Sequence, residues 1–350
     1  MRRVMKLAAG AVTAALVVAG CGGDEPGTGT ASPSGDQTAA SSVKVGLAYD
    51  VGGRGDQSFN DAAAAGLDKA KAELGVQATE AEATSGEPES AREERLRLLA
   101  EDGYNPVIGV GFAYTGSMDK VAAEFPETQF AIVDGPDAKD ADNVAKLLFA
   151  EEQGSFLVGA AAALKSRSGI IGFVGGVEVP LIKKFEAGYT AGAKAVDPDV
   201  EVQVKYLTQP PNFDGFRDPA RGKTAAEGMY DAGADVVYHA AGGSGGGVFE
   251  AAKAAGGKAI GVDSDQYETA DPKVRDVIIT SMLKKVDVAV FDFISSVVGG
   301  SFQAGEVRYD LERGGIDYST SGGMVDDIKD RLDDYKQKII GGEIQVPTAP

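Results

Sequence analysis

One segment of the sequence has the spacing of a hydrolase nucleophile. Residues 242–246 read G-G-S-G-G and match the G-x-S-x-G turn, with Ser244 at its centre, between a predicted strand and a predicted helix. A serine nucleophile needs a histidine as its base, and the only histidine of the chain, His239, lies five residues before Ser244 on the preceding strand. Because this order does not fit a catalytic triad on such a turn, the sequence argues against a serine hydrolase.

Two other patterns resemble cofactor sites without completing them. Residues 222–224 read G-K-T like the end of a phosphate-binding P-loop, but Arg217 stands where that loop needs its first glycine. Asp218 and Pro219 instead predict the N-cap and first turn of a helix. One histidine and one cysteine leave no soft metal site, and no EF-hand spacing appears, although carboxylate sites for hard cations stay open. We therefore expect no catalytic residue, no cofactor and no metal site.

A set of polar, aromatic and glycine residues follows the predicted strands. In open α/β sheets, ligands bind beyond the carboxyl ends of the strands. Each residue alone has an ordinary explanation, since acidic residues commonly cap helices and a loop phenylalanine usually packs locally. Together they outline a cleft between two lobes. The candidate ligand-binding residues are Asp50, Ser58, Phe59, Asn60, Asp134, Phe216, Gly242, Asp263 and Lys284.

The elements that must position these residues alternate regularly. From residue 43, short β-branched strands alternate with alanine-rich helices, and a second series of the same kind begins at residue 169 without visible sequence repeat. This pattern predicts two α/β, Rossmann-like lobes, each with a parallel sheet covered by helices. Residues 43–148 plus about 280–308 are assigned to the N-terminal lobe. Residues 149–279 plus about 309–350 are assigned to the C-terminal lobe, with one helix near 326–340.

The start of the chain has the layout of an export signal. Three basic residues precede an apolar run over residues 7–18 that is too short to span a bilayer comfortably. The run ends in V-V-A-G-C, which resembles the lipobox of bacterial lipoproteins, so residues 1–20 are predicted to be a signal peptide and Cys21 the site of lipid (palmitate) attachment. Residues 21–42 carry no large apolar side chain and predict a flexible linker. We expect an extracytoplasmic protein anchored to the outer face of the cell membrane; whether export uses the Sec or the twin-arginine route stays open.

The charge of the chain restricts its partners. The formal net charge is −19 over 350 residues, and removal of the three basic residues of the signal segment takes it from −19 to −22. Nucleic acid and anionic lipid surfaces are themselves negative, so neither is an expected partner of the folded part.

Five segments, taken together, resemble one protein family. They read D-Q-S-F-N, F-R-D-P-A-R-G-K, a glycine-rich loop, G-V-D-S-D-Q and T-S-M-L-K, and they are residues 56–60, 216–223, 241–248, 261–266 and 280–284. In this order they resemble the basic membrane protein (BMP) family, whose PnrA-like members are nucleoside-binding lipoproteins of ABC importers. The resemblance covers residues 43 to about 322 and implies a type I periplasmic-binding-protein fold with a hinged cleft. Residues 64 and 65 are both alanine where members often carry an aromatic and an acidic residue, a departure that affects the shape of the base pocket.

The resemblance also implies roles for the candidate residues. Phe59 and Phe216 would sandwich a flat base, and Asp50, Asn60 and Asp134 would meet its polar edge. Asp263 would accept from ribose hydroxyls, Lys284 would donate to the sugar, Ser58 would close the binding loop, and Gly242 would let the backbone approach closely. These roles predict a monomeric receptor, and not an enzyme, that captures nucleosides and delivers them to an ABC permease.

Three readings of the function remain open at this point. The resemblance favours purine nucleosides, although the residues themselves do not rank purines against pyrimidines or identify the permease. A receptor of the same fold for a sugar or a signalling ligand that feeds a sensor is the alternative. An enzyme on two Rossmann-like lobes is the third reading, and the scarcity of histidine argues against it.

Overall fold

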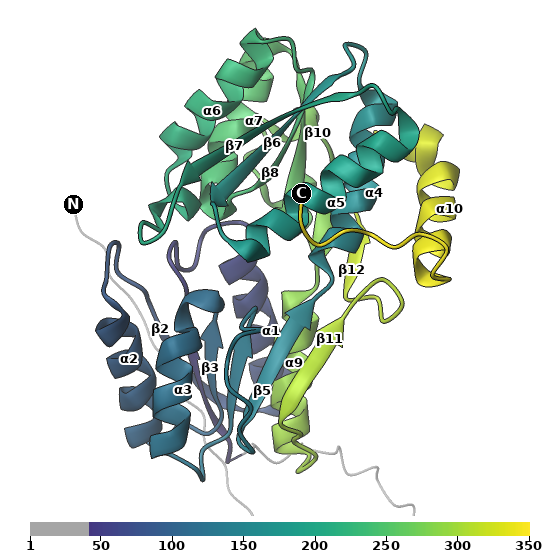
Figure 1. Cartoon of the computed structure of the whole chain (residues 1–350). Helices are drawn as coiled ribbons and strands as arrows, with labels where there is room; N and C mark the ends of the chain where they lie inside the picture. The colour runs from purple at the N-terminus through teal and green to yellow at the C-terminus, as the bar shows by residue number, and fades with distance from the viewer. Residues whose placement is uncertain (1–41) are drawn as a thin grey trace, which may run out of the picture. The chain divides into compact units, whose positions relative to one another are not determined.

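The computed structural model describes residues 42–350 of the chain (Figure 1). The predicted signal peptide, Cys21 and nearly all of the predicted linker lie outside the described residues. Within them, the two lobes belong to one compact unit.

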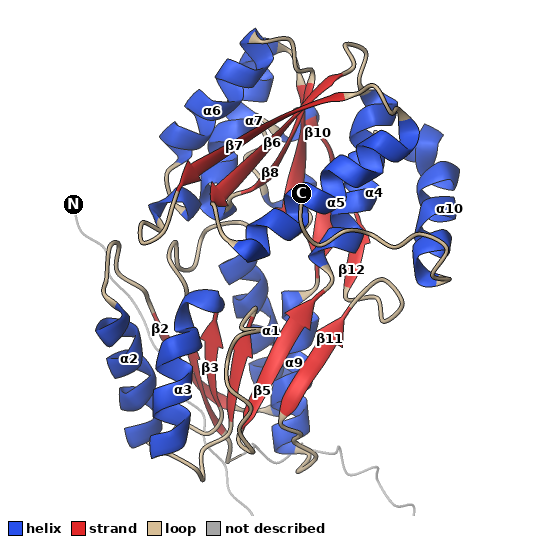
Figure 2. Ribbon diagram, viewed as in Figure 1, coloured by secondary structure: helices blue, strands red, loops and turns tan. Residues whose placement is uncertain are grey.

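Each lobe is built on a sheet of six strands (Figure 2). The first sheet has the order β11-β5-β4-β3-β1-β2 and is parallel throughout. Its strands are β1 Lys44–Ala48, β2 Gln77–Ala81, β3 Val107–Val110, β4 Phe130–Val133, β5 Val144–Phe149 and β11 Gly305–Tyr309. The second sheet has the order β12-β10-β9-β8-β6-β7, and only its edge strand β12 is antiparallel. Its strands are β6 Ile170–Val177, β7 Glu201–Thr208, β8 Val236–Ala240, β9 Lys258–Asp263, β10 Ile278–Lys284 and β12 Ile316–Tyr318. The predicted fold class is confirmed.

Helices cover both faces of the parallel sheets, which is why the central strands are apolar along their whole length. Every residue of β3 (VIGV) and β4 (FAIV) is buried. In β1, successive side chains point to opposite faces, so Leu47 packs in the cluster that contains Leu67 and Ala48 in the cluster that contains Leu99. The helices of the first lobe are α1 Phe59–Leu74, α2 Glu89–Glu101, α3 Thr115–Glu124 and α9 Val286–Val298. Those of the second are α4 Glu151–Lys165, α5 Pro180–Val196, α6 Pro219–Asp231, α7 Gly245–Ala255, α8 Gln266–Thr269 and α10 Lys329–Ile340.

The chain crosses between the lobes three times. The first crossing lies at Ala150, between β5 and α4, and the third lies between β11 and β12. The second comes at Lys285, after β10, whereas the sequence analysis placed it near residue 280. The difference arises because residues 278–284 pair with β9 in the second sheet and enter the first lobe only with α9.

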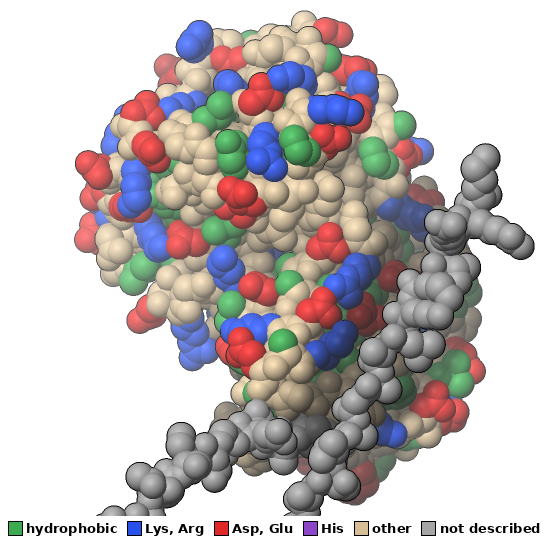
Figure 3. Space-filling view, turned by 180° about the vertical axis from the view of Figure 1, so that it is seen from behind, with side chains coloured by type: hydrophobic (Ala, Val, Ile, Leu, Met, Phe, Trp, Pro, Cys, Tyr) green, Lys and Arg blue, Asp and Glu red, His purple; other side chains and the backbone are tan. Residues whose placement is uncertain are grey.

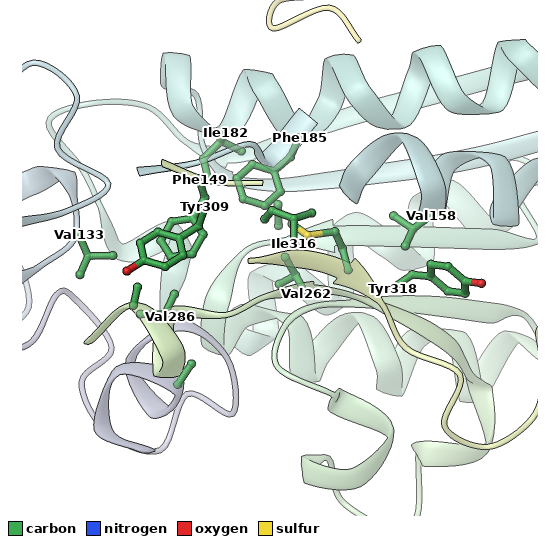
Figure 4. Close-up of a cluster of buried hydrophobic side chains, with 14 of the residues drawn as sticks. Val133, Phe149, Val158, Ile182, Phe185, Val262, Val286, Tyr309, Ile316 and Tyr318 are labelled. Carbon is green, nitrogen blue, oxygen red and sulfur yellow. The ribbon is translucent and has the colours of Figure 1, made fainter. Parts of the chain in front are cut away.

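The start of α4 ties the first and third crossings together. The Ala150 amide donates to the Tyr309 carbonyl oxygen (2.9 Å), and the Leu311 amide donates to Gln153 Oε1 (3.1 Å). A continuous hydrophobic cluster with residues from both lobes packs around the same region, and the Phe149 and Tyr309 rings stack in it with centroids 5.2 Å apart (Figure 4). The joint between the lobes is therefore a packed core and not a loose linker.

The face drawn in Figure 3 is mixed in charge. On the face drawn in Figure 3, acidic and basic side chains are interspersed and apolar side chains are scattered. The large hydrophobic residues that the described part exposes are Leu98, Val204 and Val288. Among residues 42–350, no helix combines the length and the apolar character needed to cross a bilayer.

Candidate ligand-binding site

A cavity lies where the carboxyl ends of the two sheets meet. It encloses about 560 Å³ when its opening to solvent is included. The structure brings eight of the nine candidate residues to its wall, while Ser58 lies outside the lining. The eight are Asp50, Phe59, Asn60, Asp134, Phe216, Gly242, Asp263 and Lys284.

The loop before α1 is organised by a buried carboxylate. Asp56 Oδ1 accepts from the amide of Ser58 (2.9 Å) and that of Asp61 (3.1 Å). Its Oδ2 accepts from the amide and the side-chain Nδ2 of Asn60, at 2.9 and 3.0 Å. Asn60 Oδ1 in turn accepts from the Asp50 amide (3.1 Å), which fixes the end of β1 against the start of α1. In the sequence Asp56 is only the first residue of the D-Q-S-F-N segment, whereas in the structure its four hydrogen bonds set the shape of the loop.

Aromatic side chains reach the cavity from both lobes. Phe59 is the first residue of α1, and Phe216 ends a 3₁₀ turn that follows β7. The edge of Phe112 packs against Phe216, with centroids 6.4 Å apart and planes at 69°. A Cβ at Gly176 would lie 2.4 Å from the Phe216 ring, so only glycine leaves room for the ring in this position. Gly242 has φ +53°, and a Cβ there would lie 3.0 Å from the Phe216 carbonyl oxygen.

Three buried aspartates lie at the carboxyl ends of strands: Asp50 and Asp134 come after β1 and β4, and Asp263 is the last residue of β9. Burial raises the pKa of Asp50 to about 7, that of Asp134 to about 6 and that of Asp263 to about 7. The charge of Lys284 opposes this rise at Asp134 and Asp263. Asp50 and Asp263 can therefore gain or lose a proton near neutral pH, and so can donate as well as accept a hydrogen bond. Asp134 Oδ1 is buried and has no hydrogen-bond partner within the described residues.

Lys284 is the cation of the cavity. Its Nζ lies 2.5 Å from Asp134 Oδ2 and 3.0 Å from Glu151 Oε1. Burial alone would lower its pKa, but the carboxylates of Asp134, Glu151 and Asp263 outweigh burial and hold the pKa above its usual value. The ammonium group is therefore charged at physiological pH. The sequence analysis missed Glu151, because an acidic residue at a helix N-terminus after a strand has an ordinary dipole explanation.

Aromatic rings surround the same ammonium group. The Nζ lies 5.2, 4.9 and 5.6 Å from the ring centroids of Phe59, Phe149 and Phe185. Cation–π attraction therefore adds to the ion pairs in stabilising the buried charge.

Ser58 does not line the cavity but makes hydrogen bonds to the opposite lobe. Its hydroxyl donates to Asp263 Oδ2 (2.6 Å), and its carbonyl oxygen accepts from the Ser264 hydroxyl (3.0 Å). Gln266 Nε2 donates to the Gln57 carbonyl oxygen (3.0 Å) next to it. One oxygen of Asp263 is therefore engaged by the opposite lobe, and the polar contacts between these two loops hold the lobes together at the edge of the cavity.

His239 and Ser244, which resemble part of a hydrolase motif in the sequence, make hydrogen bonds that stabilise the fold. The His239 side chain is fully buried, shares a hydrogen bond with Gln266 Oε1 (3.0 Å), and has its pKa lowered to about 4 by burial. The Ser244 hydroxyl donates to the Gly215 carbonyl oxygen (2.7 Å) and accepts from the Asp218 amide (2.8 Å). Asp218 caps α6 as predicted, because its Oδ1 accepts from the Arg221 amide (2.9 Å). Residues 42–350 contain no group of three side chains placed to hold a metal ion.

The sequence matches a known family along this whole fold. Residues 43–349 match the family described as Bmp, ABC transporter substrate-binding protein PnrA-like. The chain belongs to this family. The predicted family resemblance is thus confirmed, and the Bmp family consists of substrate-binding proteins of ABC transporters, which are not enzymes.

Relatives and solved structures agree with this assignment. The chain is 33% identical to the ABC transporter nucleoside-binding protein BmpA of Lactococcus lactis, over 99% of each chain. It is 36% identical to an uncharacterized lipoprotein of Pyrococcus abyssi, over 86% of this chain and 73% of that one. A crystal structure of solute-binding proteins of an ABC transporter system from Aeropyrum pernix K1 is similar with a TM-score of 0.77 and 32% identity, covering 87% of this chain and 93% of that one. Lipoproteins among the relatives indicate an extracytoplasmic, membrane-associated location.

Proposed function

We propose that this Bmp-family protein is a lipid-anchored, monomeric receptor that captures nucleosides outside the cell, with purine nucleosides favoured, and delivers them to the permease of an ABC importer. The observation that carries the proposal is the cavity itself, in which aromatic side chains from both lobes meet four buried aspartates and one buried lysine. A flat heterocycle joined to a polyhydroxylated sugar matches that combination. The similarity to a relative named as nucleoside-binding supports the same ligand class.

The proposed roles follow from the chemistry of each side chain. Phe59 and Phe216 offer π faces to a base, a contact that tolerates different bases. Asp134 offers a buried, unpartnered oxygen to the polar edge of the base, with Asp50 and Asn60 beside it.

The sugar would lie at the other polar residues of the cavity. Asp263 can accept from neighbouring ribose hydroxyls, and the Lys284 ammonium can donate to them. Because ligand contacts come from both lobes, binding favours the closed arrangement, and the permease can distinguish that arrangement from an open one.

Calorimetry with a panel of ligands tests the proposal. We expect heat of binding with nucleosides among adenosine, guanosine, inosine, cytidine and uridine, with the purine members binding more tightly, and much weaker binding of free ribose. Binding of a free pentose, hexose or inositol without any nucleoside would instead establish the sugar-receptor alternative.

A pair of neighbouring phenylalanines provides a matched test of the stacking role. Phe216→Ala removes a ring that lines the cavity, and we expect nucleoside affinity to fall by about ten- to a hundredfold, since base stacking contributes roughly 1–3 kcal/mol. Phe213→Ala removes a ring from the same turn that packs on Phe112, with centroids 5.7 Å apart, and does not line the cavity. Equal losses of affinity in the two variants, measured by calorimetry, would contradict the stacking role.

A further inference from the structure

Glu151 and Lys284 meet at the points where the chain passes between the lobes. Lys284 is the last residue of β10, directly before the second crossing, and Glu151 is the first residue of α4, directly after the first crossing. The two side chains are each 1% exposed and their charged atoms lie 3.0 Å apart. The ion pair between Glu151 and Lys284 therefore lies where the chain passes between the two lobes.

The second oxygen of Glu151 leads to another part of the cavity wall. Glu151 Oε2 accepts from Nζ of Lys184 at 3.4 Å, and Lys184 lies on α5. The same helix places Leu181, Ile182 and Phe185 in the wall of the cavity. A buried carboxylate is costly unless its oxygens are paired, and here each oxygen meets a different lysine.

Glu151 also restricts the direction of the Lys284 ammonium group. A lysine ammonium has three N–H donors. The Nζ donates to Asp134 Oδ2 and forms an ion pair with Glu151 Oε1, and three aromatic rings lie near it. Because Lys284 lines the cavity, the donor that these carboxylates do not take is the one available to a ligand.

We propose, on the basis of the nucleoside-binding function above, that Glu151 is a positioning residue for ligand binding. It keeps the Lys284 ammonium group charged and directed into the cavity, and it links that group through Lys184 to the helix that forms the cavity wall. It does not touch the ligand itself.

The charges around Lys284 determine how ligand affinity should change with pH when Glu151 is replaced. Carboxylates face its ammonium group from the loop after β4 (Asp134), from α4 (Glu151) and from the end of β9 (Asp263), and Lys184 of α5 faces Glu151. Burial lowers the pKa of Lys284 and the three carboxylates together raise it. Removing the charge of Glu151 therefore lowers that pKa, so the ammonium group, and with it ligand affinity, is lost at a less alkaline pH.

Glu152 provides a matched control on the same helix turn. It is also buried and also makes an ion pair, since its Oε1 lies 3.0 Å from Arg308 Nη2, but it does not contact Lys284. In the full chain, calorimetry should be run from neutral to alkaline pH with the tightest-binding nucleoside of the panel. We expect Glu151→Gln to weaken binding about tenfold and to move the alkaline loss of binding to lower pH. Glu152→Gln should leave the affinity and the pH at which binding is lost close to those of the wild type.

Results that overturn the inference are distinct from those that overturn the proposed function. Equal effects of the two variants, or no effect of Glu151→Gln, remove the positioning role. If no nucleoside binds the wild type, the proposed function fails, but the inference can still be tested by NMR of lysine-labelled protein. The Lys284 Nζ resonance is assigned as the one that is absent from the spectrum of Lys284→Arg. Its pKa must then be lower in Glu151→Gln than in the wild type, and an unchanged value overturns the role. If Glu151→Gln does not fold, Lys184→Met replaces it, with a severalfold loss of affinity expected and wild-type affinity overturning the role.

Discussion

Asp50 shows how burial sets the behaviour of a single carboxyl group. Burial raises its pKa to about 7, and the hydrogen bond that it accepts from the Val51 amide (2.7 Å) opposes the rise only in part. The native state therefore holds this proton between about pH 4 and pH 7, where the unfolded chain has already lost it. Because the native state binds more protons in that window, this group makes the free energy of unfolding fall as pH rises, by up to roughly 1.4 kcal/mol per pH unit.

A substitution at this residue tests that dependence. Asp50→Asn keeps the shape of the side chain but cannot ionise, so we expect the melting temperature to fall less steeply between about pH 4 and pH 7 than in the wild type. Differential scanning calorimetry at several pH values measures the two slopes. The exposed Asp142→Asn is the control and should keep the wild-type slope. Parallel slopes for Asp50→Asn and the wild type would show that Asp50 is not the group that titrates.

The sequence indicated most of the polar residues that line the cavity, but it missed most of the apolar lining and the residues that hold the polar side chains in place. Asp50, Asp134 and Asp263 could be found because carboxyl ends of parallel strands meet at one edge. Glu151 and Asp56 act through hydrogen bonds and ion pairs to other side chains. Spacing along the chain does not show which oxygen meets which donor, so their roles appear only with the structure.

The loop before α1 gives a prediction at the level of an element. Asp56 accepts four hydrogen bonds at the helix start and Asp61 accepts two from the same loop, from the amides of Gly55 (2.6 Å) and Gln57 (2.9 Å). Asp56→Ala leaves buried donors unpaired, so we expect a loss of about 2–4 kcal/mol in stability and a clear loss of ligand affinity. Asp61→Ala should cost about 1 kcal/mol and leave affinity unchanged. Urea unfolding and calorimetry measure both, and equal stability losses would contradict the special role of Asp56.

Elements with strong periodic patterns were predictable, and short edge strands were not. The apolar runs of β3 and β4 and the N-cap of α6 have clear signals in the sequence. β12 has only three residues, and β11 (GEVRY) is mixed in character, so neither shows a distinct pattern. The position of the second crossing depends on the pairing of β10 with β9, a contact between strands that periodicity does not encode.

At the scale of the whole molecule, anchoring and ligand capture should be separable. The proposed lipid site, Cys21, and the cavity belong to different parts of the chain, with about twenty residues of predicted linker between the site and β1. We expect the Cys21→Ser variant to be lost from the membrane fraction of cells, while its nucleoside affinity stays within twofold of the wild type. Cell fractionation measures the membrane association, and calorimetry measures the affinity. Membrane retention equal to the wild type would refute lipid attachment at Cys21, and lost affinity would refute the separation.

The strand order also determines when each lobe can be completed. β11 and β12 are the last two strands of the described chain, and each is the edge strand of a different sheet. A polypeptide that emerges N-terminus first, from a ribosome or from a translocation channel, lacks the edge strand of the first lobe until residue 309 is free and that of the second lobe until residue 318 is free. Domains fold as units, so neither lobe reaches its native form early in synthesis. The interleaved chain thus places the completion of both lobes near the end of synthesis.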